Sequence, residues 1–82
     1  MKRPDEIRAA LLKLAETRGP TKTFCPSEVA RGLDATHWQD LIDEVRAVAR
    51  ELIASGVLVA KQAGQVVDMD AAKGPIRLGL KP

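Results

Sequence analysis

A long helical stripe of apolar residues runs from about residue 37 to residue 55 and limits the folds open to this chain. The stripe consists of Trp38, Leu41, Ile42, Val45, Val48, Ala49, Leu52 and Ile53. They recur every three or four positions, which places them on one face of an α-helix. Such a helix must cover its apolar face with other elements, and Gly56 marks its end. In a chain of 82 residues it has to be the centre of a single domain, spanning 1–82.

A first helix is predicted to begin at Pro4. Proline suits the first turn of a helix. The positive end of the helix dipole favours acidic residues there, such as Asp5 and Glu6. Gly19 and Pro20 stop it. Its expected buried stripe consists of Ile7, Ala10, Leu11, Leu14 and Ala15.

A second, shorter helix is predicted to open at Pro26, after a short edge strand over Thr21–Phe24. We expect the Glu28 side chain to bond back to the free amides at the start of this helix. The turn that follows offers two caps for the long helix, Asp34 and Thr36, and the second of these resembles a capping box.

A narrow β-hairpin is predicted after the long helix. Val57–Lys61 is rich in β-branched residues, Ala63-Gly64 supplies a tight turn, and Gln65–Asp68 returns as the second strand. Residues 76–80 alternate in polarity, with Arg77 on the face opposite the apolar residues. The chain is therefore predicted to be α+β, with three helices and a small antiparallel sheet. This is the order of a winged helix, in which a helix-turn-helix precedes a β-wing.

Enzymatic chemistry finds no support in the sequence. The chain has one histidine and one cysteine, which excludes a His/Cys metal cluster. Its serines, Ser27 and Ser55, sit in no nucleophile motif, and no glycine loop cradles phosphate. We therefore expect no catalytic residue, no bound metal and no cofactor.

Compartment and membrane attachment follow from composition. The single cysteine excludes an internal disulfide, which is typical of a reducing compartment. The N-terminus turns acidic before any apolar stretch develops, unlike a signal peptide. No apolar run approaches the roughly 20 residues that span a bilayer. The sequence predicts a cytoplasmic protein with no membrane contact.

The fold class makes double-stranded DNA the first partner to consider. The net charge of +2, from 13 basic and 11 acidic residues, permits nucleic-acid binding without requiring it. If DNA is bound, the expected contacts are His37, Arg46, Arg50, Lys61 and Arg77. Convergence of Lys61, Lys73 and Arg77 would favour contact through the wing to backbone phosphate or the minor groove.

The exposed side of the long helix weighs against ordinary insertion into the major groove. Its first half carries Asp40, Asp43 and Glu44 with no cation before Arg46. Carboxylates close to phosphates are repelled, each by about 1 kcal/mol at short range in water. This face favours an alternative function, a protein–protein interaction or dimerisation module that keeps the fold and does not bind DNA. The partner would be another protein or a second copy of the chain.

Arg77 and Cys25 each have two interpretations. Arg77 either contacts phosphate or has a structural role, bonding backbone carbonyls near Gly74 or a helix end. Cys25, at the start of the second helix, is either a small half-buried residue or a thiol made reactive by the helix N-terminus. The absence of a second cysteine in the sequence favours the inert interpretation.

Three segments together resemble a bacterial family of small proteins, the domain of unknown function 3253. They are Thr23–Arg31, the tryptophan-led stretch Trp38–Arg46, and Gly74–Leu78. The resemblance covers most of the chain, and the Gly-Pro-Ile-Arg segment is its most distinctive part. It implies a winged-helix fold and no established activity.

Overall fold

Three helices are followed by three strands in the computed structural model, which describes residues 4–81. The helices are α1 (Pro4–Arg18), α2 (Pro26–Leu33) and α3 (Trp38–Ala54), and the strands are β1 (Leu58–Gln62), β2 (Gln65–Val67) and β3 (Arg77–Leu80). This confirms the predicted α+β class, and the order is compatible with a winged-helix topology. The ends of the predicted domain, residues 1–3 and 82, lie outside the described residues.

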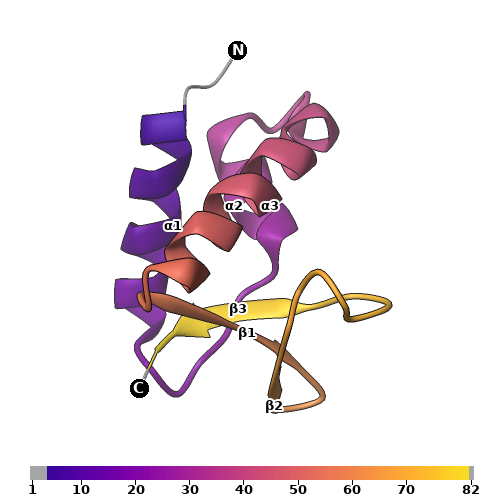
Figure 1. The fold of residues 1–82 in the computed structure, drawn as a ribbon. Coiled ribbons are helices and arrows are strands. Elements are labelled where there is room, and N and C mark those ends of the chain that lie inside the picture. Colours follow the sequence, from indigo (N-terminus) through magenta and orange to yellow (C-terminus); the bar gives the residue numbers. More distant parts are fainter. Residues whose placement is uncertain (1–3, 82) are drawn as a thin grey trace.

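The strands form an antiparallel sheet in the order β2-β1-β3. The central strand pairs Lys61 with Val66 on one side and with Arg77 on the other. Figure 1 shows the helices gathered above the sheet and the β1–β2 hairpin projecting away from them. The last strand, β3, thus lies at the side of β1 opposite β2 and runs under the helices.

The predicted edge strand over Thr21–Phe24 is reduced to a single bridge. Phe24 pairs with Leu78 of β3, its amide donating to the Leu78 carbonyl at 2.8 Å and its carbonyl accepting the Leu78 amide at 2.7 Å. The strand prediction was wrong because α2 begins two residues later, at Pro26, so only one pair fits. The bridge nevertheless buries Phe24 completely.

The core confirms the long apolar stripe of α3. Val45 and Ala49 are fully buried, and Leu41, Val48 and Leu52 are nearly so. From α1 the fully buried residues are Ile7, Leu11 and Ala15. Ala10 and Leu14, predicted to share that stripe, are only half-buried. They lie on the flank of α1 that faces α2, where the packing leaves part of their surface open.

The helix caps differ from the prediction. Glu28 does not bond back to the start of α2; its carboxylate accepts from Arg18 Nη2 at 2.8 Å, and that helix has no side-chain cap. Neither of the two caps proposed for α3 is used: His37 is the N-cap residue, and no side chain caps the helix. Asp34 Oδ1 instead accepts the amides of Thr36 and His37 at 3.1 and 3.0 Å, in the turn that leads into the helix.

The loop between β2 and β3 is held at several points. Gln62 Nε2 donates to the Lys73 carbonyl at 2.5 Å and to the Pro75 carbonyl at 3.2 Å. Met69, which lies within this loop, is 4% exposed and belongs to the core. Asp70 pairs with Arg50 of α3. The loop is therefore attached both to the wing and to the longest helix.

The hairpin turn contains a strained residue that predicts a stabilising substitution. Ala63 has φ 53° and Gly64 has φ 80°, the two positive values that a type I′ turn requires. Alanine tolerates this region poorly, whereas asparagine is enriched in it. Ala63→Asn should raise the free energy of unfolding by about 0.5–1 kcal/mol, measured by urea denaturation. The control Ala47→Asn, on exposed α3, should lower it because asparagine is a weaker helix former.

Candidate functional site

Two of the predicted DNA contacts, Lys61 and Arg77, lie side by side on the sheet. They are direct partners in the β1–β3 register, and Val66 is the partner of Lys61 in the β1–β2 register. Directly opposed residues of antiparallel strands point to the same face. Leu58, Ala60 and Leu78 occupy the other face and are buried. The cations therefore belong to the face turned away from the core, which we call the outer sheet face.

The outer sheet face is cationic and partly apolar. Val66 is 65% exposed, and Arg77 is also exposed. The three strands contain no acidic residue. The ladder continues for one more pair, since the Lys81 amide donates to the Val57 carbonyl at 3.0 Å. Alternation from Arg77 through Gly79 then places Lys81 on the same face.

Lys81 is a candidate that the sequence prediction missed. The signal was available in the alternation of residues 77, 79 and 81. Lys73, by contrast, does not join Lys61. Its carbonyl accepts the side chain of Gln62, which follows Lys61 on β1 and alternates to the opposite side of that strand.

Arg77 has the structural role that was one of its two interpretations, with a different partner. Its Nε donates to Thr23 Oγ1 at 2.7 Å and its Nη2 to the Thr23 carbonyl at 3.0 Å. The acceptors were expected near Gly74 or at a helix end. Both actual acceptors are neutral, so the guanidinium is oriented and its charge is not cancelled by a carboxylate. A guanidinium has five N–H donors, which leaves some for a ligand.

The three candidates on or beside α3 do not join this face. Arg50 Nε lies 2.6 Å from Asp70 Oδ1 in an ion pair. His37, at the start of the helix, lies 3.6 Å from Asp34 and about 20 Å along the axis from Arg50. Arg46 is half-buried and has no ion pair with any residue in 4–81. Arg46 lies one helical turn before Arg50, but Arg50 is neutralised by Asp70 and His37 is distant, so the three residues supply no continuous basic surface.

The exposed side of α3 is acidic. Asp40, Asp43 and Glu51 are exposed, and only Glu51 is neutralised, by Arg8 of α1 at 3.0 Å. Negative charge at these positions would face the phosphates of any duplex that received this helix. Of the two surfaces, the outer sheet face is therefore the one whose charge does not oppose an anionic ligand.

The side chains of Trp38 and Cys25 both make contacts with other residues of the chain. Trp38 is half-buried against the core, and the Arg31 guanidinium stacks over its ring at 4.4 Å from the centroid. That contact occupies a ring face that could otherwise receive a base. Cys25 is half-buried and its sulfur accepts a hydrogen bond from Ser27 Oγ at 3.0 Å. Within residues 4–81, no group of three or more potential metal ligands gathers in one place.

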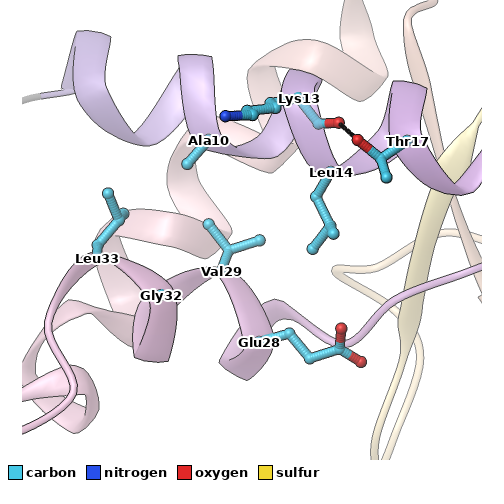
Figure 2. A pocket seen from close by; sticks show the side chains of 8 residues that line it. All are labelled: Ala10, Lys13, Leu14, Thr17, Glu28, Val29, Gly32 and Leu33. Atoms are coloured by element: carbon cyan, nitrogen blue, oxygen red, sulfur yellow. Dashed lines mark hydrogen bonds between the residues drawn. The ribbon is translucent and has the colours of Figure 1, made fainter.

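A second surface feature is an apolar groove of about 280 Å³ between α1 and α2. We call it the α1/α2 groove. It is lined by Ala10, Lys13, Leu14, Thr17, Glu28, Val29, Gly32 and Leu33. Figure 2 shows Leu14 pointing from α1 toward α2, with Val29 and Leu33 pointing back at α1. The sequence assigned Ala10 and Leu14 to the core and so concealed this groove.

The fold and the outer sheet face define a small α+β domain of winged-helix order with a cationic sheet surface. No helix within residues 4–81 is long and apolar enough to cross a bilayer. The family model described as "Protein of unknown function (DUF3253)" matches residues 4–81. The chain belongs to this family. A search of curated proteins found no match to it.

The hydrogen bonds that Asp34 accepts in the turn before α3 predict a specific pH dependence. The amide of His37, supported by that of Thr36, holds the pKa of the Asp34 carboxyl below its ordinary value of 3.8. A lowered folded-state pKa means that the ionised carboxylate favours folding. This contribution is complete above the ordinary pKa and is lost as the pH falls through the lowered one.

Asp34→Ala should therefore lower the melting temperature at neutral pH, and the difference from the parent should narrow below about pH 4. Melting temperatures of both proteins are measured by circular dichroism across pH 2–7, a range that spans the ordinary titration of a carboxylate at roughly pH 4. Asp43→Ala, on exposed α3, is the control and should show less narrowing. A difference that is constant with pH would contradict a stabilising role for the hydrogen bonds that the Asp34 carboxylate accepts.

Gly32 predicts a second stabilising substitution. It lies inside α2 without a positive φ, and a Cβ built there meets nothing within 4 Å. Gly32→Ala should raise the free energy of unfolding by about 0.5–1 kcal/mol, because alanine loses less backbone entropy in a helix. Gly64→Ala, with φ +80°, should lower it. Chemical denaturation of both variants decides whether the chain itself needs glycine at position 32.

Proposed function

We propose that this protein is a non-enzymatic, DNA-binding or transcription-associated module that contacts the phosphate backbone of double-stranded DNA through its outer sheet face. The observation that carries the proposal is the pairing of Lys61 with Arg77 on adjacent strands that contain no acidic residue. Lys81 extends the same face. Three cations on one face of the sheet can follow the regularly spaced phosphates of a duplex.

The chemistry of the two central cations supports phosphate as the ligand. Lysine supplies a point charge on a flexible stem, and arginine supplies a planar fork of donors that matches phosphate oxygens. Because Thr23 already orients Arg77, binding would immobilise fewer rotamers of that side chain. Contacts to the backbone position a protein without reading sequence. The acidic side of α3 makes base reading by that helix unfavourable, so the proposed binding has little sequence preference.

The salt dependence and a matched pair of variants test this function. A fluorescently labelled duplex of 20 base pairs, about two helical turns of DNA, is titrated with protein at low salt. The titration is then repeated at increasing salt concentrations. With three phosphate contacts, the slope of log K against log salt should be about −3. A duplex of different sequence should bind with similar affinity.

Lys61→Glu should weaken binding by about tenfold or more, because one attraction becomes a repulsion at the centre of the face. Lys73→Glu makes the same change in net charge on the other side of β1 and should weaken binding less. Equal losses in the two variants would contradict the assigned surface. A parent protein that does not bind at low salt would remove the proposed function.

The competing function is protein–protein interaction or dimerisation without DNA binding. The acidic exposed side of α3 and the α1/α2 groove favour it. Absence of duplex binding in the titration, together with a concentration-dependent mass in sedimentation, would select it over the DNA-binding function.

A further inference from the structure

The α1/α2 groove lies on the helices and contains none of the cations assigned to the outer sheet face. Its walls are apolar, formed by Ala10 and Leu14 on one side and Val29 and Leu33 on the other (Figure 2). These half-buried or buried side chains leave an open channel where two helices would ordinarily close on each other. An apolar channel of this kind between helices is a recurrent site for a partner side chain.

Gly32 is the second feature of the groove that matters for an occupant. Glycine inside a helix lowers stability relative to alanine, so it is usually retained for a turn, a positive φ or a close approach. No such need exists here: the backbone at Gly32 is not in the positive φ region and no described atom of a neighbouring segment lies within 4 Å of a Cβ built there. The missing side chain opens the wall of the groove on its solvent side. The space is available to a group from outside the chain.

The size of the groove indicates what kind of group it takes. Pockets for drug-sized ligands measure about 300–1,000 Å³, and this one measures about 280 Å³. It is open along the helices and has few polar groups to orient a small molecule. One large apolar side chain, presented by a helical segment lying over Gly32, fits the dimensions better.

The charge at the rim indicates the neighbours of that side chain. Glu28 is neutralised by Arg18 at 2.8 Å. The Lys13 ammonium has no ion pair with any residue in 4–81, and only its backbone carbonyl is engaged, by Thr17. The rim is therefore positive, and it complements a carboxylate. On a helical partner, a carboxylate three or four positions from the apolar anchor lies on the same face.

We propose that the α1/α2 groove binds a short helical segment of a partner protein, with one leucine- or phenylalanine-sized anchor between Leu14 and Leu33 and an acidic residue paired with Lys13. The proposal does not depend on DNA binding. Its partner is defined by chemistry: an acidic amphipathic helix with an apolar anchor.

A peptide selection tests the proposal directly. A displayed library of random 15-residue peptides, about four helical turns in length, is selected on the full chain, and enriched peptides are synthesised and titrated. The expected peptides carry a large apolar residue with Asp or Glu three or four positions away. Gly32→Leu should reduce their affinity by about tenfold or more by filling the groove. This variant should fold, because the backbone there is helical and the added Cβ meets open space.

Reversal of the charge at Lys13 is the second test of the proposal. Lys13→Glu should weaken the acidic peptides and strengthen versions in which their carboxylates are replaced by lysine. Lys22→Glu, an equal charge change away from the groove lining, is the matched control and should leave both unchanged. Lys61→Glu should also have no effect, which separates this site from the outer sheet face.

The outcomes against the proposal are equally specific. Selection that enriches no peptide sensitive to Gly32→Leu overturns it, and so does enrichment of basic peptides. A parent chain that dimerises in sedimentation while Gly32→Leu stays monomeric would show that a second copy occupies the groove, and the assignment to an acidic partner helix would then be wrong.

Discussion

The antiparallel bridge between Phe24 and Leu78 is the contact on which the arrangement of this fold depends. It joins the segment between the first two helices to the last strand, and it places a fully buried phenyl ring between helices and sheet. The neighbouring Thr23 carbonyl accepts from Arg18 on one side and from Arg77 on the other. Because the two arginines come from α1 and β3, a single backbone position fixes both halves of the molecule. In a domain this small, whose core has little margin, such a long-range tie has a large effect on stability.

The elements with strong periodicity could be predicted from the sequence. The stripe of α3 places Val45 and Leu52 in the core, and the proline and glycine positions mark the limits of α1. The alternation that put Arg77 outside and Leu78 inside also holds. Predictions that relied on a particular side-chain partner were less successful. Glu28 pairs with Arg18 instead of capping its own helix, because a charged partner ten residues away in sequence lies within 2.8 Å in space. The spacing of neighbouring residues in the sequence does not show which distant side chains come together in the folded chain.

For the candidate surfaces, too, individual residues could be predicted from the sequence, whereas their partners in space could not. Lys61 and Arg77 could be named from the sequence, but their adjacency depends on β3 pairing with β1, which the hairpin alone does not specify. The pairing of Arg50 with Asp70 was also hidden, since it requires the loop after β2 to fold back on α3. The groove was missed because a helical spacing of apolar residues does not tell a buried position from a flanking one. Ala10 and Leu14 satisfy the period of the buried stripe, and only the position of α2 shows that they are half open.

The attachment of the loop between β2 and β3 has a mechanical consequence for the wing. Gln62 fastens the end of β1 to the carbonyls of Lys73 and Pro75, while Asp70 and Met69 fasten the same loop to α3 and to the core. A hairpin without such contacts can move relative to the rest of the domain and can change its shape when it binds a curved ligand. Here the contacts of the loop hold the hairpin against the domain, so its curvature is fixed when the chain folds. A duplex or any other extended partner would have to adapt its own shape to this surface.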